Sequence, residues 1–219
     1  MTTDLLFAIR GVRVNNILNV DHLDIKKGKV TCITGESGAG KSTLMKMLNK
    51  MISPDSGEIF YKGTPLKDID SVQHRRKVIM QSQVPLIFPG TIKDNLMMGY
   101  ILNGTKPDDD GVLKQAIHNM QMTKELDEDA GTLSGGEKQR LALARILLLA
   151  ADVYLLDEPT SALDEDTEMM VLDHLIPEIK KKHASLIMIT HSRKVNEQYA
   201  EERIDLSQLP LREEVEKNT

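Results

Sequence analysis

A glycine-rich segment in the first quarter of the chain has the residues needed to bind a phosphate chain. The pattern GxxxxGK followed by Ser or Thr is matched in full by Gly35, Glu36, Ser37, Gly38, Ala39, Gly40, Lys41, Ser42 and Thr43. Glycines permit a tight turn with inward-facing N–H groups, and a following helix N-terminus favours an anion. Lys41 would neutralise the β- and γ-phosphates, and the Ser42 hydroxyl would ligate Mg²⁺. We call Gly35 to Thr43 the P-loop.

A second group of reactive side chains follows the apolar run Val153–Leu156. Asp157 and Glu158 stand at the end of this run, where an open α/β sheet places its ligands. Asp157 suits the Mg²⁺ shell, reached directly or through a water, and Glu158 suits a general base that orients the attacking water. Such a pair could by itself be a helix cap. Together with an upstream P-loop it favours nucleotide hydrolysis.

A third motif, Leu133 to Arg140, reads LSGGEKQR. Its Ser-Gly-Gly opens a long helix and so forms a second phosphate-binding helix N-terminus. The octamer resembles the signature of the ATP-binding cassette (ABC) ATPases. This resemblance implies that the signature of one subunit closes over the ATP held by the P-loop of another, giving a homodimer around two ATPs. The nucleotide-contacting residues would be Ser134, Gly135, Gly136 and Glu137.

A glutamine before the segment Pro85–Thr91 resembles the glutamine loop of the same family. The resemblance implies that Gln83 reaches Mg²⁺ and the attacking water and that its loop touches a membrane permease. Gln81 is a rival two residues earlier. Gln83 is preferred because family members place a Leu-Phe pair four and five residues after the glutamine, and Ile87-Phe88 fits that spacing.

Two further segments complete the resemblance. Ser161–Asp164 is similar to the family loop that crosses the dimer interface. His191, which follows the apolar run Leu186–Thr190, resembles the switch histidine that contacts the γ-phosphate. A lone histidine at a strand end is usually structural, but the other motifs favour the functional interpretation. The implied catalytic set is Glu158, His191, Lys41 and Gln83.

One position departs from the family. ABC ATPases commonly carry an early aromatic residue that stacks on adenine, and the matching position here is Val14. No Phe, Trp or Tyr occurs from Ala8 to Ile59. Base stacking is worth about 1–3 kcal/mol. We therefore expect weaker base discrimination, with apolar contact from Val14 alone.

The motifs need a scaffold of alternating strands and helices, which indicates an α/β fold. The resemblance implies a P-loop NTPase core with a mostly parallel sheet, N-terminal antiparallel strands and an inserted helical subdomain. Predicted strands are Leu5–Arg10, Ile17–Ile25, Val30–Thr34, Glu58–Tyr61, Lys77–Met80, Val153–Leu156, Ser185–Thr190 and Ile204–Leu206. Predicted helices are Ser42–Met51, Val112–Met122, Gly135–Leu149 and Asp166–His183. We expect one domain: a RecA-like core at 1–90 and 131–210, a helical lobe from 91–130 continuing into the signature helix, and a tail at 211–219.

Composition narrows the possible partners. The chain has 219 residues, a net charge of −5 and 3% aromatic residues, which disfavours nucleic-acid binding. The single Cys32 rules out an internal disulfide and suggests a reducing compartment. We expect neither a signal peptide nor a membrane-spanning segment. The resemblance therefore implies a separate permease and peripheral attachment at the cytoplasmic face of the membrane.

Within the family, CITGESGAGKSTLMKMLNKMISPDSGEI, QSQVPLIFPGTIKDNL and LDEPTSALDE resemble the ATPases of small bacterial two-component exporters linked to iron efflux and metal stress. A soluble ABC ATPase acting on DNA or ribosomes is an alternative. It is disfavoured because neither a long coiled-coil insertion nor a tandem cassette is present. A P-loop kinase of small metabolites would leave Leu133–Arg140 unexplained.

Overall fold

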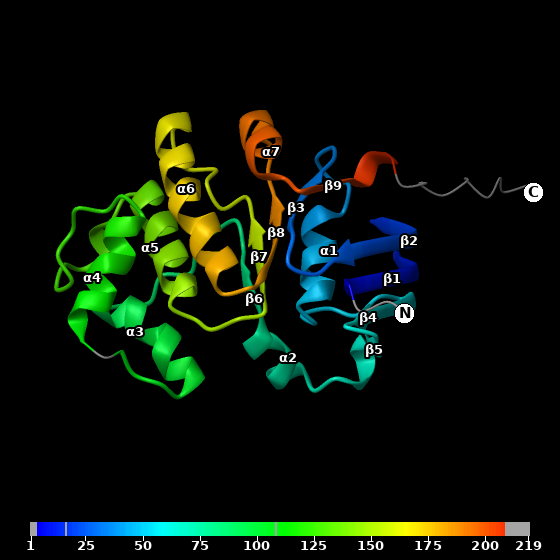
Figure 1. The fold of residues 1–219 in the computed structure, drawn as a ribbon, viewed down its shortest axis with the longest axis horizontal. Coiled ribbons are helices and arrows are strands. Elements are labelled where there is room, and N and C mark those ends of the chain that lie inside the picture. Colours follow the sequence, from blue (N-terminus) through cyan, green and yellow to red (C-terminus); the bar gives the residue numbers. More distant parts are fainter. Residues whose placement is uncertain (1–3, 16, 108, 209–219) are drawn as a thin grey trace, which may run out of the picture.

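The computed structural model describes residues 4–15, 17–107 and 109–208 (Figure 1). The predicted tail at 211–219 lies outside these residues. Two sheets and seven α-helices are present in the described part. Figure 1 shows a small sheet at one end of the molecule, helices α3, α4 and α5 at the other, and the second sheet between them.

The small sheet is antiparallel and contains the strands near the N-terminus. Its order is β2-β1-β4-β5, with β1 at Leu5–Val14, β2 at Leu18–Lys26, β4 at Ser56–Tyr61 and β5 at Thr64–Pro65. Phe7, Ile9 and Val12 of β1 are buried, whereas Arg10 and Arg13 are only partly so. This near-alternation, interrupted by a register shift between Arg10 and Arg13, is typical of a sheet with one face on the core.

The second sheet is parallel throughout, and the predicted catalytic motifs follow its strands. Its order is β6-β7-β8-β3-β9, with β3 at Val30–Thr34, β6 at Val78–Gln81, β7 at Val153–Asp157, β8 at Ser185–Ile189 and β9 at Glu202–Asp205. Both faces are covered, so the inner strands are continuous apolar runs. Since carboxyl ends of parallel strands share one edge, the segments after β3, β6, β7 and β8 meet there.

Seven helices pack around these sheets in the described ranges. Their bounds are α1 Lys41–Leu48, α2 Ser71–Lys77, α3 Ile92–Asn103, α4 Asp110–Asn119, α5 Gly135–Leu147, α6 Glu165–Lys181 and α7 Arg193–Tyr199. Helices α3 and α4 pack on α5, which also packs on α6. The lobe is thus joined to the parallel sheet through the helix that begins at the signature motif.

Two hydrophobic clusters lie on opposite faces of the parallel sheet, and successive side chains of β7 point alternately into one cluster and the other. Val153 and Leu155 face the cluster shared with α1 and the antiparallel sheet. Tyr154 and Leu156 face the cluster shared with helices α3 to α6. Cys32 is fully buried in this second cluster, and burial raises the pKa of its thiol to about 11. The thiol is therefore an inert core group.

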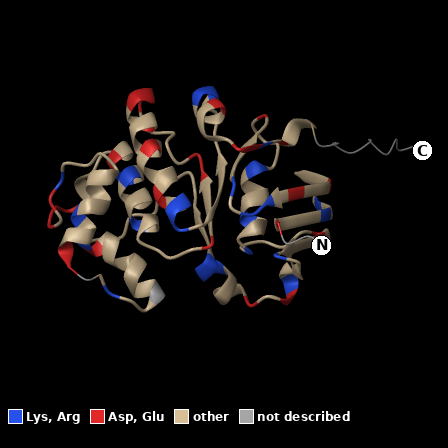
Figure 2. Cartoon of the chain, viewed as in Figure 1, with Lys and Arg blue, Asp and Glu red and all other residues tan. Residues whose placement is uncertain are grey.

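Charged side chains of both signs are interspersed over the core and the lobe (Figure 2). Some ion pairs connect separate elements: Lys62 after β4 lies 2.6 Å from Asp152 before β7, and Lys93 of α3 lies 2.6 Å from Asp110 of α4. Each is partly exposed, so its contribution to stability is about 0–1 kcal/mol. Hydrophobic burial, rather than these pairs, holds the two sheets and the lobe together.

The predicted fold class is confirmed, with an α/β core, an N-terminal antiparallel sheet and helices between β6 and β7. The predicted helix Ser42–Met51 ends earlier, at Leu48, and Lys50 takes a left-handed conformation with φ 60°. Helices α2 and α7 were not predicted, and α3 was expected only as an undefined part of the helical lobe. Helices α2 and α7 each have seven residues and one buried side chain, His74 or Val195, so neither shows apolar periodicity. The boundary between core and lobe stays a prediction.

Candidate nucleotide-hydrolysis site

The P-loop connects β3 to α1 and leaves the start of that helix open. Gly40 has φ 83°, a conformation that glycine adopts without strain, and it caps α1 with no side-chain hydrogen bond. The first N–H groups of α1 therefore remain available to an anion. The buried Lys41 ammonium donates to the carbonyls of Gly35 and Glu36, each at 2.8 Å. These bonds fix the lysine over the loop.

The β1–β2 hairpin lies against the P-loop. A Cβ on Gly40 would be 3.0 Å from the Ile17 carbonyl oxygen and 3.0 Å from Leu18 Cδ1, so any larger residue would crowd the hairpin. Val14, the predicted base contact, is 7% exposed and belongs to the core cluster. Ile17 is 47% exposed beside it. Sequence reasoning missed Ile17, although its position in the turn after Val14 was a usable signal.

Asp157 ends β7 with its carboxyl group buried beside the P-loop. Burial raises the pKa of this carboxyl group, while a hydrogen bond from the Ser42 side chain opposes the shift. Ser42 and Asp157, two of the three residues predicted as magnesium ligands, are therefore in contact. Carboxylate and hydroxyl oxygens are hard donors, which Mg²⁺ prefers.

The Glu158 carboxylate lies between two predicted site residues. The Gln83 amide donates from Nε2 to Glu158 Oε2 at 2.8 Å, and His191 Nε2 lies 3.2 Å from Glu158 Oε1. The segments after β6, β7 and β8 thus converge on one carboxylate. Gln81, the rival, is 5% exposed, and neither of its side-chain polar atoms has a hydrogen-bond partner among the described residues. The contacts favour Gln83.

The backbone at Glu158 is left-handed, with φ 47°. A non-glycine residue in this region costs on the order of 1–3 kcal/mol, and the conformation persists only where other contacts hold it there. The Glu158 N–H donates to the Ile189 carbonyl at 3.1 Å, which provides part of that support. Such strain is typical of residues whose side chains must be aimed at a reaction centre.

The signature motif forms the N-terminus of α5, on another part of the chain. Ser134 caps the helix and Glu137 returns a bond to the Ser134 N–H at 2.8 Å, which is a capping box. These bonds from Ser134 lower the pKa of the Glu137 carboxyl group. Ser134 and Gly135 are exposed. The hydrogen bonds found for the Ser134 backbone N–H and hydroxyl in the described structure go to Glu137, and none joins it to the P-loop of the same chain.

A residue inside the signature motif, Gln139, was not singled out from the sequence. It is 1% exposed, and its side chain bonds to the segment that contains Glu158. The position within LSGGEKQR was the available signal. Gln139 was not predicted because no chemical role was assigned to that position of the motif.

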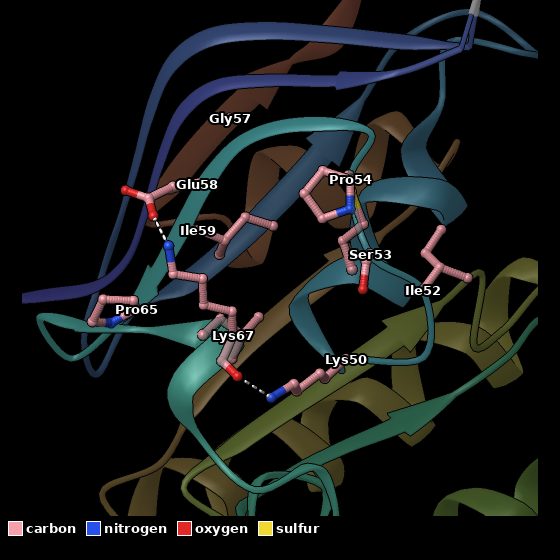
Figure 3. Close-up of a pocket in the computed structure, with 11 residues that line it drawn as sticks. Lys50, Ile52, Ser53, Pro54, Gly57, Glu58, Ile59, Pro65 and Lys67 are labelled. Carbon is pink, nitrogen blue, oxygen red and sulfur yellow. Dashed lines mark hydrogen bonds and ion pairs between the residues drawn. The ribbon is translucent and has the colours of Figure 1, made fainter.

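A cavity of about 190 Å³ lies by the C-terminal end of α1, away from the P-loop. Figure 3 shows the residues that line it. Pro54, Ile59 and Pro65 line it with apolar surface. Lys67 at its rim pairs with Glu58, and Lys50 donates to the Lys67 carbonyl at 3.2 Å. Both ammonium groups are thus already bonded within the chain, and the cavity is not part of the nucleotide site.

Comparison with known proteins identifies the class of protein. The family described as ABC transporter matches residues 18–161, so the chain belongs to the ABC transporter ATP-binding family, and it is an ABC ATPase. Over 188 residues it is 40% identical to the lactococcin-A transport/processing ATP-binding protein LcnC of Lactococcus lactis, covering 83% of this chain but only 26% of that protein.

A second relative is nearer in length. The probable iron export ATP-binding protein FetA of Escherichia coli is 34% identical over 181 residues, covering 81% of this chain and 79% of that protein. Among solved structures, a bacterial Atm1-family ABC exporter with ATP bound has a TM-score of 0.83 at 25% identity. That match covers 97% of this chain and 39% of the exporter chain. These comparisons confirm the predicted family and fold.

Proposed function

We propose that this chain energises an ABC transporter by hydrolysing ATP in a homodimer that closes around two nucleotides. The observation that carries the proposal is the Glu158 carboxylate, held between Gln83 at 2.8 Å and His191 at 3.2 Å. It directly follows Asp157, which contacts Ser42 of the P-loop. A base, a metal-binding carboxylate and a phosphate cradle are therefore neighbours.

The ATP phosphates would bind to the open N–H groups of α1 and to Lys41. Mg²⁺ would be held by Ser42 and Asp157, with Gln83 near by, and when bound it would neutralise charge on the β- and γ-phosphates. Among the described residues no group of three or more His, Cys, Asp or Glu side chains could hold a metal. A site of one carboxylate, one hydroxyl and substrate oxygens suits Mg²⁺.

Glu158 would orient and polarise the attacking water. In the structure one of its carboxylate oxygens accepts from the Gln83 amide, and the other lies 3.2 Å from His191 Nε2. Hydrogen bonds of free catalytic groups commonly rearrange when substrate binds. We expect Gln83 to turn to the metal and His191 to the terminal phosphate. Both Glu158 oxygens are then free, and one of them can accept a proton from water.

The second half of each site would come from the partner subunit. Ser134 and Gly135 lie exposed at a helix N-terminus, which attracts phosphate. The Ser134 N–H and hydroxyl bond to Glu137 within the described part of one chain. A twofold dimer would bring this end over the partner's γ-phosphate. Residues Ser134 to Glu137 then complete the anion cradle that Lys41 begins.

A permease would bind near the Gln83 loop. Leu86 of this loop and Leu102 of α3 are exposed and line a cavity of about 210 Å³ together with Phe88 and Leu149. Exposed apolar surface of this kind suits a helical segment of a partner protein. Along the described ranges, no helix of the chain itself has the length and hydropathy to cross a bilayer. Attachment would then be peripheral, at the cytoplasmic face.

Iron is the proposed cargo class. The support is the motif similarity to metal-stress exporters and the likeness to FetA, whose name states iron export. The chain would not contact the metal, because the permease handles cargo. Cells lacking this chain should accumulate more iron after an iron pulse, measured by elemental analysis. If the iron content were unchanged and the export of another solute were altered, iron would be rejected as the cargo in favour of that solute.

Glu158→Gln tests the hydrolytic proposal. The amide keeps the shape but cannot accept the proton, so phosphate release should fall by about 10²–10⁴-fold. ATP binding should persist, and gel filtration with Mg·ATP should show a trapped dimer that wild-type protein forms only transiently. If Glu158→Gln hydrolysed ATP at the normal rate, Glu158 would not be the general base. If the variant stayed monomeric under all conditions, the proposed dimer would be wrong.

A further inference from the structure

The Gln139 side chain ties the signature helix to the catalytic carboxylate segment of the same chain. Its Nε2 donates to the Glu158 carbonyl at 3.0 Å and to Ser161 Oγ at 3.3 Å. Its Oε1 accepts from the Ala162 N–H at 3.0 Å. All three bonds cross from α5 to the segment between β7 and α6. The amide is thus satisfied at both ends within this segment.

These bonds act on the backbone of Glu158. The left-handed φ of 47° is costly, so the peptide groups on both sides need partners. The Glu158 N–H donates to the Ile189 carbonyl at 3.1 Å. The Glu158 carbonyl accepts from Gln139 at 3.0 Å and, within its own turn, from the Ser161 N–H at 3.3 Å. The direction of the Glu158 side chain therefore depends on two external anchors. One anchor is β8, and the other is the signature helix.

The start of the signature helix is packed on the same segment. A Cβ on Gly136 would lie 3.1 Å from Leu163 Cδ2 and 3.2 Å from the Ala162 carbonyl oxygen. Little space remains for the helix to move without moving residues 158–164. Close packing of this kind transmits small displacements between neighbouring elements. Gln139 adds directional bonds to that steric contact.

We infer that Gln139 is a positioning residue that couples the two composite ATP sites of the dimer. The inference rests on the proposed function. The N-terminus of α5 meets the nucleotide of the partner subunit, whereas Glu158 acts on the nucleotide of its own P-loop. Docking of Ser134 on the partner's phosphate would shift α5 and, through Gln139, fix the backbone of Glu158. A small error in that position slows the reaction strongly, by up to about 10²-fold per ångström.

A purely structural role for this buried glutamine makes a different prediction. Replacing a purely structural glutamine would lower the melting temperature and the amount of folded protein. It would leave the kcat, KM and Hill coefficient of the folded molecules unchanged. A positioning role lowers kcat with little change in KM, because nucleotide binding uses other residues. It also weakens communication between the two sites. The Hill coefficient for ATP, at most about 2 for two sites, should fall towards 1.

Two substitutions and one control separate these roles. Gln139→Met keeps the length but removes all three bonds. Gln139→Glu keeps an acceptor for Ala162 but loses the donor to the Glu158 carbonyl. Ile146→Val, on the same helix and away from residues 158–164, reports ordinary loss of packing. Each is measured for melting temperature, kcat, KM and Hill coefficient on the folded fraction.

The expected result is a drop in kcat of about 10–100-fold in both Gln139 variants, with KM within threefold and loss of cooperativity in Gln139→Met. Ile146→Val should keep the wild-type kcat and cooperativity. The inference is overturned if Gln139→Met and Gln139→Glu retain wild-type kcat and cooperativity. It is equally overturned if they merely melt earlier, as Ile146→Val does. If wild-type protein is inactive, or Glu158→Gln is fully active, the proposed function itself fails. Inactive Glu158→Gln with normal Gln139 variants rejects this inference alone.

Discussion

The amide of Gln83 lies 2.8 Å from the carboxylate of Glu158, although the two residues are 75 positions apart in the chain. They meet because β6 and β7 are adjacent and parallel, so the residues after each strand emerge at the same edge of the sheet. His191, after the next strand β8, closes on the same carboxylate from the other side. This convergence supports one catalytic centre.

Gln83 and Gln81 offer a matched pair of substitutions. Gln83→Leu should lower kcat by about 10²-fold, because it removes the amide nearest the Glu158 carboxylate. Gln81→Leu should keep kcat near wild type and leave stability unchanged or raise it. The reason is that the Gln81 amide is buried without partners in the described structure, so an apolar side chain of similar size removes an uncompensated desolvation cost. Steady-state phosphate release and thermal melting measure both effects.

Equal activity losses in the two glutamine variants would contradict the assignment of Gln83. A loss confined to Gln81→Leu would transfer the role to the earlier glutamine.

Asp157→Asn should separate stability from activity. Burial raises the pKa of the Asp157 carboxyl group in the folded chain, so folding favours the protonated form. The resulting penalty is absent below the unfolded pKa, near 4, and grows as pH rises through the folded pKa. At neutral pH the amide should therefore stabilise the nucleotide-free protein, by about 1 kcal/mol. Hydrolysis should be lost because the metal-binding charge is gone.

Melting curves at pH 7 with and without Mg·ATP measure this effect. Mg·ATP should raise the melting temperature of wild-type protein more than that of Asp157→Asn. Equal increases in melting temperature, together with unchanged hydrolysis, would exclude Asp157 from metal binding.

His74 predicts acid sensitivity of the fold. The ring is buried, its Nε2 lies 2.7 Å from the Leu48 carbonyl oxygen, and its Nδ1 has no partner among the described residues. Burial lowers the pKa of the His74 imidazole in the folded chain. The folded state therefore favours the neutral ring, and stability is full above the unfolded pKa of about 6.5 and falls as pH drops below it.

Urea unfolding of wild type and His74→Gln at pH 7.5 and 5.5 checks this expectation. The glutamine amide can still donate to the Leu48 carbonyl but does not titrate. The difference in unfolding free energy between the two pH values should be smaller in His74→Gln, by about 1 kcal/mol. Identical pH dependence would assign the acid sensitivity to other groups.

The protein should discriminate only weakly between adenine and guanine nucleotides. No Phe, Trp or Tyr occurs from Ala8 to Ile59, Val14 is largely buried, and the exposed Ile17 turn lies on the P-loop. Aliphatic contact lacks the roughly 1–3 kcal/mol of stacking, so kcat/KM for ATP and GTP should agree within about tenfold. Ile17→Tyr should tighten binding of both nucleotides. Side-by-side titrations of wild type with a strong preference for ATP would refute the idea.

Local patterns in the sequence carry much of what defines this protein. The P-loop, the strand ending in Asp157-Glu158 and the LSGGEKQR motif are short segments in which neighbouring residues hold the whole signal. Long apolar runs such as Val153–Leu156 indicate buried strands. Short elements with one buried side chain, α2 and α7, have no such pattern and were missed.

Relations between distant residues depend on the tertiary structure. The order β6-β7-β8-β3-β9 brings Gln83, Glu158 and His191 together and leaves Gln81 buried. Packing of α5 on residues 158–164 gives Gln139 its bonds. The chain's local patterns therefore specify which chemical groups are present. Strand order and packing, set by burial of apolar surface shared among many distant residues, decide which of those groups touch.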